Sequence, residues 1–170
     1  MEKLDLYDNR KELLGKVFDR DSGEPESGEY KLSTHVWIIN SKKEFLIQRR
    51  SATRKKNPLK WAFTGGAVDL GEKSYEGAIR EVKEELGILA LKENVELLLS
   101  FKREKDFVDV WLVRQNVDIK SVVIQEDEVC EAKFVDFDKL EHMVMNGEFV
   151  PAVDLYFSTF KKLLIKDNII

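Results

Sequence analysis

The sequence predicts an α/β fold in which a mixed sheet is flanked by helices. Most of the chain alternates short runs of β-branched and aromatic residues with turn residues, as strands do. Three segments, 74–86, 138–147 and 151–165, instead carry apolar residues at helical spacing. With 170 residues, of which 43% are hydrophobic, the chain is long enough to bury one sizeable core. We expect one domain over 1–170, with a hairpin and loop in 1–28 and a C-terminal helix in 148–170.

Charge and composition exclude several classes of protein. The net charge of −4, from 28 basic and 32 acidic side chains, argues against a general nucleic-acid-coating protein and predicts no stable nucleic-acid partner. The first ten residues lack the apolar core of a signal peptide, and no apolar run approaches the roughly 20 residues of a membrane span. The expected location is cytoplasmic, with no membrane partner. Cys130 is the only cysteine, which excludes an intrachain disulfide, and its apolar surroundings predict a small buried thiol.

The N-terminal half reads as strands and loops. Residues 4–8 and 13–20 are separated by "NRKE" and predict a hairpin. The Gly-, Pro- and Ser-containing segment 20–30 predicts a loop. Residues 31–40 and 44–50 are apolar enough to be central, buried strands. They are followed by a basic loop, 51–60, which Pro58 interrupts.

The C-terminal half predicts three more strands and two helices. Residues 95–116 read as a strand pair that turns around Lys105 and Asp106, and 129–137 read as a further strand. The helix over 138–147 is expected to end at Gly147 as its C-terminal cap. The last helix is expected to open at Pro151, because proline is favoured in the first helical turn.

The segment 74–86 gathers acidic residues beside an apolar stripe. Ser74 is expected to cap this helix and Gly87 to close it. At about 100° per residue, one stripe faces the sheet and the carboxylates of Glu81, Glu84 and Glu85 share the adjoining arc. The stripe consists of Tyr75, Ala78, Ile79, Val82 and Leu86.

Like charges one turn apart cost roughly a few tenths of a kcal/mol per pair. A solvated acidic face is one interpretation of the three glutamates. A hard divalent cation that takes oxygen ligands is the other. The second is favoured by Gly65 and Gly66, which precede the helix in a loop that brings backbone close to a ligand and ends at Glu72.

The spacing of these residues resembles the signature of the Nudix hydrolases. Gly66, five residues, Glu72, seven residues and then "REVKEELGI" over 80–88 fill every fixed position. Thr64 stands where the family commonly has proline. The resemblance implies an α/β/α Nudix sandwich with a mixed central sheet, here preceded by the N-terminal hairpin. It also implies Mg²⁺- or Mn²⁺-dependent hydrolysis of a nucleoside diphosphate linked to another moiety, or of a related pyrophosphate.

The resemblance assigns roles residue by residue. Glu81, Glu84 and Glu85 correspond to the metal-binding and base-supplying carboxylates. Gly66 is expected to offer its backbone carbonyl to a metal. Arg80 is expected to orient the carboxylates, and Glu72 to support Arg80 or to reach a metal through water.

The general base is left open between two regions of the chain. A carboxylate must take the proton of the attacking water. Glu81 is the first choice, and a later acidic turn offers an alternative, in which Glu128 is preferred. The turn consists of Glu126, Glu128 and Glu131 and is otherwise read as solvated.

Several residues near this segment were weighed as substrate contacts. Arg49 and Arg50 end a strand that leads toward the site, and one of them is expected to face a substrate phosphate. Trp61 is expected in the core rather than stacked on a base. His35 lies in an apolar strand and is expected to be packed or hydrogen-bonded rather than catalytic.

Two alternative functions are compatible with the same fold. One is a catalytically idle Nudix domain that senses a nucleotide or a protein, although such a domain is expected to lose one of the three glutamates. The other is isopentenyl-diphosphate isomerase, whose branch the N-terminal half resembles. The isomerase uses a cysteine near the glycines, where this chain has Ala67 and Val68. The sequence leaves open the small-molecule substrate, the number of metal ions and whether the chain forms a homodimer.

Overall fold

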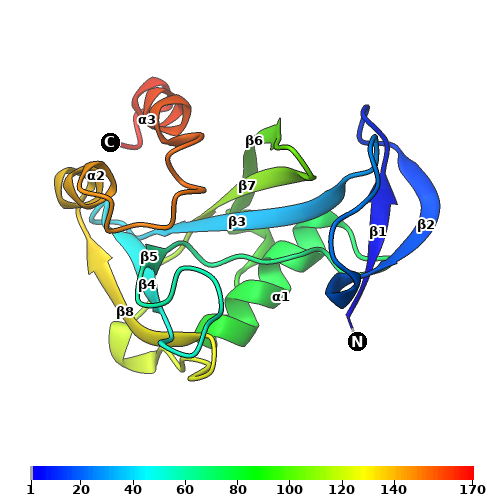
Figure 1. Cartoon of the computed structure of the whole chain (residues 1–170). Coiled ribbons are helices and arrows are strands. Elements are labelled where there is room, and N and C mark those ends of the chain that lie inside the picture. Colours follow the sequence, from blue (N-terminus) through cyan, green and yellow to red (C-terminus); the bar gives the residue numbers. More distant parts are fainter. Residues whose placement is uncertain (1) are drawn as a thin grey trace.

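The computed structural model describes residues 2–170 and contains two sheets (Figure 1). The N-terminal strands β1 (Lys3–Tyr7) and β2 (Leu13–Asp19) pair antiparallel in a hairpin. The larger sheet has six strands in the order β5-β4-β3-β7-β6, with β8 paired to β4. Its strands are β3 (Lys31–Ile39), β4 (Phe45–Arg50), β5 (Trp61–Ala62), β6 (Val95–Lys102), β7 (Asp106–Arg114) and β8 (Val129–Val135).

The large sheet is mixed, as predicted. Strands β3 and β7 run parallel over their whole length, and the other pairs are antiparallel. Parallel neighbours need a long crossover connection. The segment between β3 and β7 supplies it and contains β4, β5, helix α1 (Ser74–Leu86) and β6. Helix α1 covers one face of the sheet, while α2 (Phe137–Met145) and α3 (Phe157–Lys166) lie on the other face (Figure 1).

Alternation along β3 builds one core on each face. Val36 and Ile38 belong to a cluster with Ala78, Val82 and Leu86, three of the five residues of the predicted α1 stripe. Trp37 and Ile39 belong to the larger cluster that includes side chains of α2 and α3. The second half of β3 is buried on both faces, so residues 36–39 form a continuous apolar run, which agrees with the predicted central position of the strand.

Helix α1 occupies the predicted residues, but its predicted cap is wrong. Gly87 closes the helix with φ of 67°, in the left-handed region that glycine tolerates. Ser74 is the first helical residue and not the cap. Its hydroxyl accepts a hydrogen bond from Nε1 of Trp111 at 3.0 Å, because a part-buried indole requires an acceptor. The cap position falls on Lys73, whose amide donates to the Glu76 carboxylate at 2.8 Å.

The C-terminal helix begins six residues later than predicted. Residues 151–156 form turns, and α3 starts at Phe157 rather than Pro151. Two side chains in these turns, Val153 and Tyr156, are buried in the large core, so tertiary packing outweighs the helical spacing of the sequence. The preceding helix starts at Phe137, which the sequence had placed in a strand. The Asp136 side chain caps it by accepting from the Lys139 amide at 2.7 Å.

Cys130 is exposed, and the prediction of a buried thiol is wrong. Its neighbour Val129 is buried, so alternation along β8 turns the cysteine outward. Among residues 2–170, no helix is both long and apolar enough to span a bilayer.

Candidate active site

Glu81, Glu84 and Glu85 of α1 line one hollow of about 190 Å³. The loop before α1 contributes Gly65 and Gly66 to its wall, and the turn before β8 contributes Glu128. Arg50 enters from the end of β4. The structure therefore brings together residues that lie far apart in the sequence. The carboxylates in the lining are Glu2, Asp69, Glu81, Glu84, Glu85 and Glu128, and the guanidinium groups are those of Arg20, Arg50, Arg54 and Arg80.

Arg80 connects three of the carboxylates predicted for the site. Its Nη1 donates to Glu81 Oε1 at 2.9 Å and to Glu84 Oε2 at 3.0 Å. Its Nε donates to Glu72 Oε1 at 3.0 Å, and its Nη2 donates to Glu72 Oε2 at 3.1 Å and to the Ala67 carbonyl at 2.9 Å. One planar donor group thus fixes the helix and the preceding loop to each other.

Glu85 is the most buried acid of the site, with 5% of its surface exposed. Its Oε2 accepts from Nε2 of Gln48 at 2.8 Å and from the Gly65 amide at 3.2 Å. Within residues 2–170, no basic side chain forms an ion pair with it. Burial, together with the nearby Glu81 charge, raises the pKa of Glu85 to about 8.

Glu81 lies against the loop backbone. A Cβ added at Gly66 would stand only 2.3 Å from Oε1 of Glu81, so only glycine leaves room for this carboxylate. Burial raises the pKa of Glu81, although the ion pair with Arg80 opposes the shift. The ionised forms of Glu81 and Glu85 are therefore both disfavoured in the folded chain.

The donor set fits a hard divalent cation, because it consists of carboxylate oxygens around a polar hollow. In the described chain, residues 2–170, no three acidic, histidine or cysteine side chains already converge as a metal cluster. The hydrogen bonds of Arg80 explain this, since they draw Glu72, Glu81 and Glu84 onto one guanidinium. Nη1 of Arg80 thus holds the Glu81 and Glu84 carboxylates beside each other.

The remaining predicted residues occupy different positions. Glu72 binds Arg80 and does not line the hollow. The Gly66 carbonyl accepts the Thr34 amide at 2.8 Å, which uses one of its two lone pairs. The carboxylate of Glu128 forms an ion pair with Arg54.

The two arginines at the end of β4 face opposite ways, because side chains alternate along a strand. Arg50 lines the hollow. Arg49 donates to the Leu59 carbonyl at 3.0 Å and lies 3.7 Å from Glu131, outside the hollow. Trp61 and Trp37 are buried in the core, as predicted.

Gln48 and Arg20 are among the site residues that were not predicted. Gln48 lies in the middle of β4, and its amide is the direct partner of Glu85. Only the alternation of β4 could have indicated a polar side chain facing α1. Arg20 lies at the end of the hairpin, in a segment that reads as loop, and enters the hollow from there. No local pattern marks it, because its position depends on how the hairpin packs.

Comparison with known proteins agrees with this geometry. A family model described as NUDIX domain matches residues 29–153, which is more than half of the chain. The chain belongs to the Nudix family. This Nudix hydrolase is 37% identical to an uncharacterised Nudix hydrolase of Listeria monocytogenes over 153 residues, which covers 89% of each chain. The resemblance seen in the sequence is thereby confirmed.

Solved structures support the same assignment. A MutT protein from Methanosarcina mazei superposes with a TM-score of 0.61 at 30% identity, covering 82% of this Nudix chain and 95% of the other. A protein from Deinococcus radiodurans superposes with a TM-score of 0.73 at 24% identity, covering 88% and 92%, and shows the shared fold. The chain is thus a hydrolase of the Nudix fold, and its substrate class is a small-molecule nucleotide or pyrophosphate.

Proposed function

We propose that this Nudix hydrolase cleaves a pyrophosphate bond in a nucleoside diphosphate linked to another moiety, or in a related pyrophosphate, when Mg²⁺ or Mn²⁺ is bound. The observation that carries the proposal is the hollow itself. Glu81, Glu84, Glu85 and Glu128 meet there, and burial raises the pKa values of Glu81 and Glu85. A bound divalent cation would favour the ionised forms of these carboxylates.

Glu81, Glu84 and Glu85 are the residues that would hold the cation, with Gly66 offering the second lone pair of its carbonyl. When bound, such a cation withdraws charge from a diphosphate and lowers the pKa of a water molecule. Arg80 positions Glu81 and Glu84 through its Nη1 atom. Glu72 holds Arg80 in place by taking both its Nε and Nη2 hydrogen bonds.

Glu81 is the proposed general base. A carboxylate whose pKa is raised toward neutrality is a better proton acceptor than one at its usual value. Burial raises the pKa of Glu81, and the side chain lines the hollow. Glu128 is the alternative, since it also lines the hollow; each candidate is ion-paired, Glu81 with Arg80 and Glu128 with Arg54.

Arginines complete the site for an anionic substrate. Arg20, Arg50 and Arg54 line the hollow opposite the helix, where guanidinium groups offer paired donors to phosphate oxygens. Of the two arginines expected to bind substrate, Arg50 is the one we retain. Arg49 does not line the hollow, although both arginines donate to carbonyls of the following loop, Arg49 to Leu59 and Arg50 to Lys56.

The test is hydrolysis of a panel of nucleoside diphosphate conjugates and dinucleoside polyphosphates, with release of nucleoside monophosphate as the readout. We expect turnover with Mg²⁺ or Mn²⁺, loss of turnover in EDTA and recovery when the metal is restored. Glu93→Gln, which changes an exposed glutamate away from the hollow, serves as a matched control for Glu85→Gln. Turnover that persists in EDTA, or a Glu85→Gln enzyme as active as the control, would contradict the proposal.

A further inference from the structure

A second hollow, of about 370 Å³, adjoins the carboxylate site. The two hollows share Arg20, Gly65 and Gly66, so the second hollow is open to a molecule that is long enough to reach past the glycine loop from the carboxylates. Its floor comes from β3 and its far wall from the turn between β6 and β7. The residues that matter for what it binds are Lys31, Ser33, His35, Lys56, Arg103 and Asp106.

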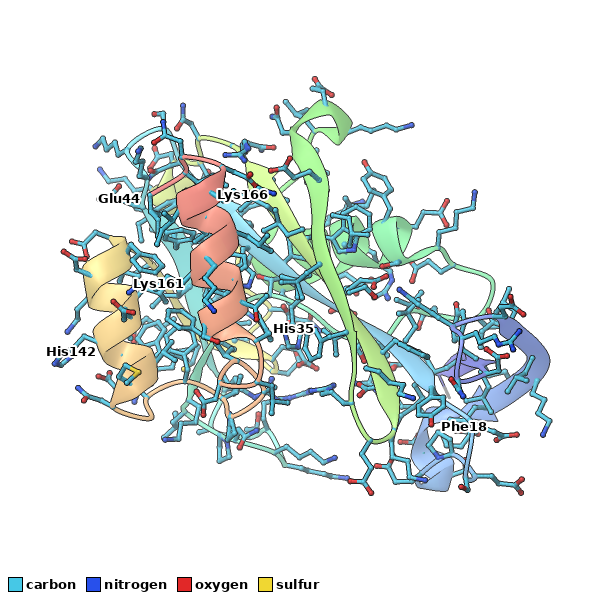
Figure 2. All side chains as sticks on the ribbon, turned by 90° about the horizontal axis from the view of Figure 1, so that it is seen from above. Phe18, His35, Glu44, His142, Lys161 and Lys166 are labelled. Atoms are coloured by element: carbon cyan, nitrogen blue, oxygen red, sulfur yellow. The ribbon has the colours of Figure 1, made fainter. Side chains whose placement is uncertain are left out.

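His35 is held in one tautomer by the core beneath it. Its Nδ1 lies 3.0 Å from the hydroxyl oxygen of Tyr156, which also accepts from Nε1 of Trp37 at 3.1 Å. An indole only donates, so the single proton of the buried Tyr156 hydroxyl is satisfied by donation to Nδ1. The imidazole proton is therefore on Nε2. Figure 2 shows His35 near the N-terminal end of α3, where Tyr156 is the cap residue.

Nε2 of His35 is free for a ligand. In the described part of the chain, the one fully buried side-chain polar atom without a partner is Oγ1 of Thr34. Nε2 forms no hydrogen bond there, so it is reached by solvent from the hollow that His35 lines. Burial and the nearby Arg103 lower the pKa of His35 to about 4, which keeps the ring neutral and leaves Nε2 as a donor.

Arg103 adds more donors to the same hollow. Its Nε donates to Asp106 Oδ1 at 2.7 Å, and its Nη2 pairs with Oδ2. A guanidinium carries five N–H groups, so the remaining ones are available to a ligand. Asp106 also accepts from the Ser33 hydroxyl at 3.1 Å, and Glu24 accepts from Lys31 at 3.0 Å. The acids of the hollow are thus already engaged.

The hollow lacks the features that recognise a flat base or an apolar chain. His35 is the one aromatic ring in the described lining, and its edge rather than its face carries the free donor. The lining has four basic and two acidic side chains. Arg20, Lys31 and Arg103 are ion-paired with Glu2, Glu24 and Asp106. The free groups in the described lining are therefore the Lys56 ammonium, Nε2 of His35 and the remaining N–H groups of Arg103, and such donors bind an anionic group rich in acceptor oxygens.

We propose that this hollow is a subsite for a second phosphoryl group, carried by the organic moiety of the substrate, and that His35 and Arg103 recognise it. The inference rests on the proposed function, because it assumes that the first hollow binds the diphosphate. It names the substrate class more closely: pyrophosphates whose attached moiety is itself phosphorylated. His35 acts as a specificity residue and takes no part in bond cleavage.

The test uses matched pairs that differ by one phosphate: coenzyme A against dephospho-coenzyme A, and ADP-ribose 2′-phosphate against ADP-ribose. Binding is measured by calorimetry on the full chain without metal, so that failure of hydrolysis does not affect the result. We expect the phosphorylated member of at least one pair to bind wild-type protein about tenfold more tightly, as a charge-assisted hydrogen bond permits. His35→Phe is expected to remove this ratio and to leave the affinity for the unphosphorylated member unchanged.

Controls separate recognition from folding. His35→Gln keeps an amide donor and is expected to retain part of the preference, whereas His142→Gln, in the exposed surface of α2, is expected to retain all of it. Circular dichroism establishes that each variant is folded. Equal affinities within both pairs for the wild type, or an unchanged preference in both His35 variants, would overturn the proposal. A metal-dependent hydrolysis that fails while the preference persists would instead contradict only the proposed function.

Discussion

Nη1 of Arg80 lies 2.9 Å from Oε1 of Glu81, within one helix and beside the glycine loop. The contact joins adjacent residues, and it exists because the guanidinium is anchored elsewhere, on Glu72 and on the Ala67 carbonyl. Arg80 thus acts as a template that presents Glu81 and Glu84 together. Its role in this Nudix hydrolase is to position other groups.

Arg80→Lys is expected to lower turnover by about 10- to 100-fold, the usual cost of losing a group that orients metal ligands. An ammonium group cannot make the forked contacts to Glu72, Glu81 and Glu84 at once. The metal concentration that gives half-maximal activity is expected to rise in parallel, and titration of Mg²⁺ in steady-state assays measures both effects. Lys83→Ala, on the exposed side of the same helix, is the matched control. Equal metal dependence in both variants would contradict the positioning role.

The two loop glycines are expected to respond differently to alanine. In Gly66→Ala the new Cβ meets the end of the Glu81 side chain, which can rotate away, so turnover falls at least about tenfold while stability changes by less than about 1 kcal/mol. In Gly65→Ala the Cβ would stand 2.1 Å from the Thr34 carbonyl oxygen, which belongs to the sheet. That variant is expected to lose roughly 2–4 kcal/mol. Urea denaturation and turnover of both proteins separate the two effects, and identical stability would contradict this interpretation.

His35 is expected to make the protein less stable in acid. Its folded-state pKa of about 4 lies below its ordinary value of 6.5, so between these pH values the unfolded chain binds more protons. Stability from this residue is therefore full above pH 6.5 and is lost as pH falls toward 4. Arg103 opposes protonation of the ring and Asp106 favours it, while Tyr156 occupies Nδ1.

Substitution isolates this contribution from that of other titrating groups. Between pH 7.5 and pH 5, His35→Gln is expected to lose less stability than wild type by on the order of 1 kcal/mol. His142→Gln should behave as wild type, because that histidine is exposed. Chemical denaturation of the three proteins at both pH values is the measurement. Parallel losses in all three would show that His35 does not carry the acid dependence.

The local sequence pattern was sufficient to predict the structure where a residue's environment depends on its own helix or strand. The bounds of α1, its closure at Gly87 and the shared arc of Glu81, Glu84 and Glu85 follow from a period of about 3.6 residues. Strands β3, β4, β6 and β7 follow equally from their apolar runs.

The local sequence pattern gave a wrong or incomplete prediction where a residue's position depends on a partner elsewhere in the chain. Ser74 is taken by Trp111, and the turns at 151–156 are fixed because Tyr156 reaches Trp37. Gln48 and Arg20 enter the site only through sheet pairing and hairpin packing, which no local spacing records. The sequence therefore predicts the carboxylates and Arg80, but not Gln48, which is hydrogen-bonded to Glu85, or Arg20.

Glu85→Gln is expected to abolish turnover and at the same time to stabilise the metal-free protein. Glu85 has a folded-state pKa of about 8, above its ordinary 4.5, so between these values the folded chain binds more protons. Its contribution to stability therefore falls as pH rises from 4.5 to 8. A glutamine carbonyl oxygen can replace Oε2 as acceptor for Gln48 and Gly65 without the charge. In EDTA at pH 8 the free energy of unfolding of the variant should exceed that of wild type by on the order of 2 kcal/mol, measured by urea denaturation.

Added Mg²⁺ or Mn²⁺ should raise the Tm of wild type and of Glu93→Gln but leave that of Glu85→Gln unchanged. A metal-induced Tm shift of equal size in the variant would show that Glu85 does not hold the cation.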